Sequence, residues 1–134
     1  MANPTAALMR GRVLAESLMV DACTIARRTG ESTNEDTGVV TPTTTTVYTG
    51  QCRIQQSQLG ADSVPADPGE AYVRLIAYEL QVPVSVTGIR VHDVATITAS
   101  ALDPDLVGRK FIVLGLTHKT HLTARRMQVQ EVAT

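Results

Sequence analysis

The first apolar positions along the chain recur every three or four residues, as on one side of an α-helix. Asn3 and Pro4 precede them and favour a helix start, because Asn accepts hydrogen bonds from free amides and Pro suits the first helical turn. The pattern predicts one amphipathic helix over residues 4–19. Its apolar positions are Ala7, Leu8, Val13, Leu14, Leu18 and Met19.

After this helix the pattern changes to short alternations rich in β-branched residues and punctuated by Gly and Pro, which is typical of antiparallel strands. Pro42 cannot donate to a strand ladder, so its strand is expected at an edge or a bulge. A polar turn with Gly30, Asn34, Asp36 and Gly38 is expected to join the first two strands. The expected strand segments are residues 20–28, 39–48, 51–56, 71–82, 94–100, 110–116 and 123–132.

This order of elements predicts a mainly β fold: a small antiparallel β-barrel of six or seven strands with one N-terminal α-helix packed on it. The length of 134 residues is typical of one domain. We therefore expect a single domain over residues 1–134, with the barrel at 20–132. Residues 57–70 are rich in Ser, Gly, Pro and Asp with little periodicity, which predicts one long loop.

Composition limits both the core and the partners. Hydrophobic residues make up 43% of the chain but aromatic residues only 3%, so we expect a thin core of Val, Ile, Leu, Ala and Met that partner subunits could complete. A net charge of -1 argues against a protein that grips nucleic acid by bulk electrostatics, so contact with DNA would be local. No apolar run approaches the roughly 18 residues of a membrane span. This predicts a soluble, intracellular chain with no membrane contact.

The residues that could carry catalysis or bind metal do not form a recognisable set. His118 and His121 flank an expected hairpin turn, but no third ligand lies near them in the sequence. Cys23 and Cys52 fall inside expected strands, which favours reduced thiols packed as small apolar side chains. The sequence has no G-x-S-x-G motif and no glycine-rich phosphate loop. We expect a protein that is not an enzyme and binds no metal and no cofactor.

Basic residues occur in adjacent pairs within or beside the expected strands. Neighbouring strand residues point to opposite faces of a sheet, so each pair offers one side chain to each face. We expect these side chains to meet acids of a neighbouring subunit rather than form a stripe for DNA. The pairs are Arg27 and Arg28, Arg109 and Lys110, and Arg125 and Arg126.

Six segments, in this order, carry a resemblance to a known family. They are residues 21–30 (DACTIARRTG), 36–38 (DTG), 47–55 (VYTGQCRIQ), 91–98 (VHDVATIT), 106–116 (LVGRKFIVLGL) and 123–129 (TARRMQV). These turn and strand segments resemble the small head-to-tail connector proteins of siphophages that infect actinobacteria, over about residues 8–132. The chain departs from that pattern at His92, where many relatives have Gly before the turn Asp.

The resemblance implies a head-closure, or stopper, protein with a β-barrel core that acts without cofactors. Such a protein forms a homo-oligomeric ring below the portal and adaptor, holds packaged DNA in the head and presents a docking surface to the tail. We therefore expect a structural virion protein of the phage neck that is assembled in the host cytoplasm. The expected partners are copies of itself, portal or adaptor proteins on the head side and the tail-terminator protein on the tail side, with transient contact to packaged DNA.

Two alternatives stay open. The same barrel composition suits a tail-terminator or adaptor ring of the same particle. A host β-barrel module that binds a small ligand or peptide comes from a different class, and a convergent apolar pocket in a stable monomer would favour it.

Two sets of residues are expected to carry the connector function. The long loop is expected to line or close the central opening of the ring, with Ser57, Gly60, Asp62, Asp67 and Glu70 as its candidate residues. The subunit interface is expected to use the wide apolar stripe of the first helix together with arginines. Its candidates are Leu8, Val13, Leu14, Leu18, Arg27, Arg109, Arg125 and Arg126, and the expected acceptors for the arginines are Glu31, Glu35, Asp36, Asp62 and Asp67.

Overall fold

A computed structural model describes residues 4–56 and 77–132 of the chain. One helix, α1 (Pro4–Ser17), precedes six strands and a short 3-10 turn, η2 (Pro104–Leu106). The strands are β1 (Asp21–Thr33), β2 (Val40–Gln56), β3 (Tyr78–Val82), β4 (Val94–Ser100), β5 (Lys110–Leu116) and β6 (Arg125–Val132). The expected helix cap at Asn3, the expected long loop at 57–70 and the expected strand residues 71–76 lie outside the described residues.

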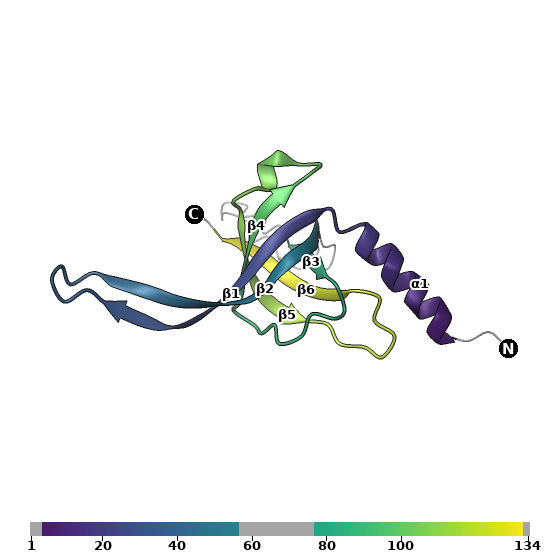
Figure 1. Ribbon diagram of the computed structural model, residues 1–134, viewed down its shortest axis with the longest axis horizontal. Coiled ribbons are helices and arrows are strands. Elements are labelled where there is room, and N and C mark those ends of the chain that lie inside the picture. Colours follow the sequence, from purple (N-terminus) through teal and green to yellow (C-terminus); the bar gives the residue numbers. More distant parts are fainter. Residues whose placement is uncertain (1–3, 57–76, 133–134) are drawn as a thin grey trace, which may run out of the picture.

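The six strands close into one antiparallel barrel in the order β1-β2-β3-β6-β5-β4, with β4 pairing back onto β1 (Figure 1). This confirms the predicted fold class, a small antiparallel barrel with one N-terminal helix. The register of β1 is set on both of its sides, since Asp21 lies opposite Cys52 of β2 and Ser100 of β4. Each of the six described strands therefore pairs with a neighbour on both of its sides over part of its length.

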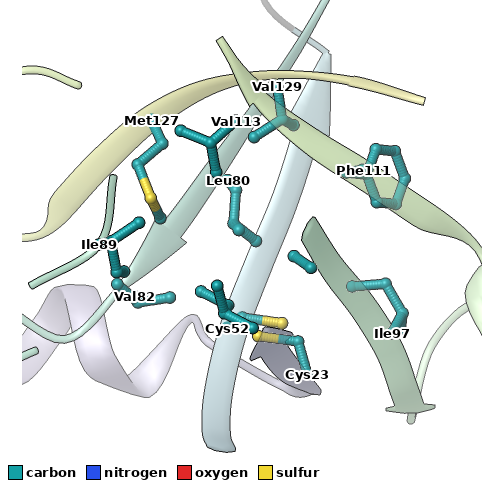
Figure 2. Close-up of a cluster of buried hydrophobic side chains, with 12 residues drawn as sticks. Cys23, Cys52, Leu80, Val82, Ile89, Ile97, Phe111, Val113, Met127 and Val129 are labelled. Atoms are coloured by element: carbon teal, nitrogen blue, oxygen red, sulfur yellow. The ribbon is translucent and has the colours of Figure 1, made fainter. Parts of the chain in front are cut away.

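In β1, β3, β4, β5 and β6 two residues that are two positions apart belong to the buried core, as the two-residue repeat of a strand requires, and β2 contributes Cys52. Figure 2 shows this cluster. The buried core contains the single Phe in addition to the expected Val, Ile, Leu, Ala and Met, and it includes both cysteines, as predicted for packed thiols. The Phe111 ring meets Tyr78 edge to face, with ring centroids 5.3 Å apart. The core cluster consists of Cys23, Ile25, Cys52, Leu80, Val82, Ile89, Ala95, Ile97, Phe111, Val113, Met127 and Val129.

The last strand begins at Arg125, two residues after its predicted start, and two predicted strand ends, after residues 28 and 48, are wrong because of glycine. The segments expected at 39–48 and 51–56 are one strand, because Gly50 continues β2 opposite Cys23 and the Tyr48 ring lies over the place where a side chain would be. The first strand, expected to stop at residue 28, runs on through Gly30 to Thr33. Glycine therefore sits within paired strands at both positions, where it allows a close approach or a bulge.

Helix α1 lies against the loop between β5 and β6. The Arg12 Nε donates to the Leu122 carbonyl oxygen at 3.0 Å, and a Cβ added at Gly11 would lie 3.1 Å from the Thr123 Cγ2. The contact face is half-buried at Leu8, Gly11, Arg12 and Ala15, and Met19 just beyond the helix is buried. The helix ends at Ser17, two residues before the predicted end. No helix in the described part of the chain is long and apolar enough to cross a membrane.

Candidate assembly surfaces

A two-stranded ribbon projects from the barrel, and we call residues 28–46 the arm (Figure 1). Every residue of the arm is exposed. The arm forms because β1 and β2 pair with each other from Asp21–Cys52 out to Thr33–Val40, whereas β4 accompanies β1 only as far as Ala26. Its six β1 residues, 28–33, extend roughly 20 Å at the usual rise of a strand.

The turn at the tip of the arm is built by side-chain and backbone hydrogen bonds. Asn34 Oδ1 accepts from the Asp36 amide at 2.9 Å, and the Asn34 carbonyl accepts from the Gly38 amide at 2.7 Å. Gly38 has φ 71°, a left-handed conformation that glycine adopts at little cost. Three of the four predicted turn residues are therefore in the turn, and Gly30 is not.

The outer edges of the arm have no strand partner in the described part of the chain, since β3 pairs with β2 only at residues 53–56. Pro42 lies in this ribbon opposite Glu31, which confirms its predicted edge position. The tip carries the exposed side chains of Val39 and Val40. An exposed ribbon with free main-chain groups is a surface that another chain can cover.

Helix α1 leaves large apolar side chains exposed on both sides of its contact with the barrel, and we call these the apolar flanks of α1. Met9 and Val13 form one flank, as follows from 3.6 residues per turn, and Leu14 together with Leu18, the first residue after the helix, forms the other. Their exposed fractions are 53%, 69%, 64% and 47%, respectively. Of the predicted helix interface residues, Leu8 is thus half-buried against the barrel, while Val13, Leu14 and Leu18 are open to a partner.

Arg27 lies where β1 leaves the barrel, and its charge is already used within the chain. Its Nε and Nη2 donate to the two carboxylate oxygens of Asp93, each at 2.9 Å, and Nη2 also donates to the Gly88 carbonyl at 2.6 Å. This hydrogen bonding to Asp93 raises the pKa of Arg27. Asp93 is 1% exposed and also accepts from the Arg90 amide at 2.8 Å. Arg27 therefore anchors the arm instead of standing free for a neighbouring subunit, which corrects the expected partner of this charge.

Two further arginines expected at an interface also bind within the chain. Arg109 bridges Asp105 at 2.9 Å and Glu131 at 2.6 Å. Arg125 donates to the carbonyl oxygens of Val84 and Val86 at 3.0 and 3.1 Å, which ties the loop after β3 to β6. Among the described residues, Arg126 alone of the four candidates has no such partner.

A match to one protein family spans nearly the whole of this fold. A model of DUF6093, a family of unknown function, matches residues 11–130. The chain belongs to this family. The DUF6093 match begins inside α1 and ends inside β6, so the barrel and the arm both lie within it. No curated protein and no solved structure matches the chain.

The thiols of this DUF6093 member are buried in the core, whereas its imidazoles are exposed. Cys23 and Cys52 are free, fully buried and side by side in the core (Figure 2), as predicted for packed thiols. The pKa of the Cys52 thiol is raised mainly by its hydrogen bond with Cys23 and, to a smaller extent, by burial. His118 and His121 are exposed in the β5–β6 loop. Within residues 4–56 and 77–132, no three His, Cys, Asp or Glu side chains converge as metal ligands.

Sequence reasoning missed the arm and the buried Asp93. The arm has a visible signal, because the run from Thr41 to Thr46 has no apolar residue except Pro42 and so cannot present an apolar face to a core. Asp93 has no such signal, since a turn aspartate looks the same whether it faces water or a distant arginine. The channel-loop candidates Ser57, Gly60, Asp62, Asp67 and Glu70 lie outside the described residues.

Proposed function

We propose that this chain is a structural subunit of the neck of a tailed bacteriophage: a head-to-tail connector, or stopper, ring that closes the DNA-filled head and offers a docking surface to the tail. The resemblance of its turn and strand segments to siphophage connector proteins supports the choice of a tailed phage as the particle. The observation that carries the proposal is the pair of uncovered surfaces, the arm and the apolar flanks of α1, on opposite sides of a closed barrel (Figure 1).

This arrangement suits assembly better than ligand capture. A closed barrel has no wall edge to offer to a partner, so contacts between copies must use elements that project from it. Two different patches on identical chains make a heterologous contact, and such contacts close into rings when the rotation between copies permits. In this proposal the chain performs no catalysis and needs no cofactor.

The proposed neighbours follow from the position in the neck. Copies of the same chain complete the ring, portal or adaptor proteins lie on the head side, and the tail-terminator protein lies on the tail side. Packaged DNA passes through or stops at the centre, where residues 57–70 are the proposed channel element. Deleting residues 60–68 should then produce particles that leak DNA.

Two measurements test the proposal. The mass of the purified chain should increase with concentration to a closed ring, and a label on the chain in intact particles should lie between head and tail. A label within the adaptor or terminator layer would instead assign the chain to that neighbouring ring. A persistent monomer with a small ligand in an apolar pocket would support the host binding module and overturn the connector proposal.

A further inference from the structure

We infer that the tip of the arm of one copy lies against the apolar flanks of α1 of the next copy, so that the ring closes head to tail. The inference rests on the proposed ring, and it names which surfaces meet. Three observations support it: the exposure of α1, the incomplete pairing of the arm, and the opposite charges of the two elements.

The helix presents more apolar surface than the barrel covers. Leu8, Gly11 and Ala15 are half-buried on the side of the helix that meets the β5–β6 loop, whereas the flanks on either side of them remain exposed. Apolar side chains thus lie on both sides of the covered face, and this stripe is wider than one contact face needs. Large side chains exposed in one group also indicate a contact surface rather than scattered surface residues.

The arm also requires a neighbour. A two-stranded ribbon is marginally stable in water without a third strand or a packed face. In the described residues neither edge of the arm is paired, and its tip exposes Val39 and Val40 at 57% and 51%. These two valines are the only large apolar side chains in the arm, so the tip is the part that suits an apolar surface.

The two surfaces carry opposite charge. The arm has Arg28, which pairs with Glu31, and two further acids at its tip, Glu35 and Asp36, which make no ion pair within the described residues. Its net charge is -2, from one arginine and three carboxylates. Helix α1 carries two arginines and one glutamate, and Arg10 is exposed between the two apolar flanks, on the side away from the barrel. Such complementarity selects a partner and its orientation.

One copy cannot bring its own arm to its own helix, because the two project to opposite sides of the barrel (Figure 1). The neighbouring copy can supply the missing element to each. The contact is then the same at every junction of the ring, with one arm and one helix in each.

Cross-linking through introduced cysteines distinguishes this contact from the other pairings. Val40→Cys places a thiol at the arm tip and Leu14→Cys places one on a flank, and both sites are exposed. The native cysteines are fully buried, so the unaltered chain treated with a short bis-maleimide is the matched control. We expect a covalent dimer only when the two variants are mixed, and a ladder of multimers from the double variant.

The other results each overturn the inference. Cross-linking of the Leu14→Cys chain with itself would mean that helices of two copies pair, and cross-linking of Val40→Cys with itself would mean that arms pair. Rings without any arm-to-helix product would also overturn the inference, while the neck proposal would stand. A label outside the neck, together with the mixed cross-link, would overturn the neck proposal and leave the contact in place.

A charge reversal provides a second test. Arg10→Glu should raise the concentration at half-assembly about two- to fivefold at low salt, in line with an exposed pair, with less effect at high salt. Reversing the arm acids as well, with Glu35→Lys and Asp36→Lys, should restore assembly. Equal melting temperatures of the variants show that the fold is intact. Failure of the second reversal to restore assembly would separate Arg10 from the arm acids and overturn the pairing.

Discussion

The buried carboxylate at the base of the arm gives the sharpest test of how the arm is held. Asp93 accepts two hydrogen bonds from the Arg27 guanidinium and one from the Arg90 amide, all between 2.8 and 2.9 Å. The substitution Asp93→Asn keeps the size of the side chain but removes its negative charge. The Asn side chain also has only one acceptor oxygen, whereas the two Asp93 oxygens accept the three hydrogen bonds from Arg27 and Arg90.

The expected loss of stability follows from burial. The Asp93 side chain is 2% exposed, and breaking a buried ion pair from one side typically costs about 3–5 kcal/mol. The Arg27 side chain is 28% exposed, so water can solvate part of the abandoned guanidinium and reduce the loss. We therefore expect Asp93→Asn to lower the free energy of unfolding by about 2–3 kcal/mol. For a domain of this size, the melting temperature should fall by roughly 6–12 °C.

Urea unfolding followed by circular dichroism measures this loss. Asp105→Asn is the matched control, because the same substitution there removes a carboxylate that also pairs with an arginine but is 81% exposed. We expect the control to unfold at nearly the urea concentration of the unaltered chain. If Asp93→Asn unfolded at the same concentration as the control, the pair at the base of the arm would not stabilise the fold and the reasoning would be refuted.

Three further predictions concern single positions. Gly50→Ala should destabilise the fold by about 1–3 kcal/mol, because the new Cβ would lie 2.6 Å from the Tyr48 Oη and force the ring to move; an unchanged urea midpoint would contradict this contact. Burial raises the pKa of Tyr48 to about 12, with smaller contributions from Cys23, Cys52 and Glu16. The unfolded chain therefore loses this proton before the folded chain does, so the free energy of unfolding should fall as pH rises from 10 to 12. Tyr48→Phe should make this fall shallower in urea titrations at several pH values. His92 has φ 77°, so His92→Gly should be neutral or stabilising by up to about 1 kcal/mol, whereas a clear loss would show that the imidazole supports the turn.

The barrel is predictable from sequence because its wall repeats one simple rule. In β5, Phe111 and Val113 point inward, and in β6, Met127 and Val129 do the same, each two residues apart. The alternation identifies which residues are buried without any knowledge of the strand order. Strand order and closure come from pairings between distant segments, which local pattern does not encode.

The errors fall where a local signal has two meanings. Gly50 reads as a strand end, but in the fold it makes room for the Tyr48 ring, whose hydroxyl donates to the Gln51 carbonyl at 2.8 Å. His92 stands at a position where the resemblance implies Gly, and the backbone there is left-handed, so the fold retains the glycine-like conformation without the glycine. Both features depend on a neighbour or a backbone angle that residue type alone does not reveal.

Part of the candidate interface is predictable from the sequence and part is not. The apolar flanks of α1 follow from the helical repeat, since a stripe wider than one contact face can be counted in the sequence. The arginines do not follow, because a guanidinium near a strand end satisfies a distant acid as readily as a partner chain. Arg27 pairs with Asp93, which is 66 residues away in the sequence, and no local pattern indicates that pairing.

The anchor at Arg27 also bears on assembly, because the arm can only position a neighbouring copy if it leaves the barrel in a fixed direction. Two register shifts lie at its base, between Ile25 and Ala26 and between Arg28 and Gly30, and each bends or twists the ribbon locally. The bidentate contact to Asp93 lies between these two shifts and holds β1 to the loop after β3 at the point where β4 begins. In the proposed ring the angle would be the same at every junction, so a buried ion pair at this position would serve the geometry of the proposed contact as well as the stability of the barrel.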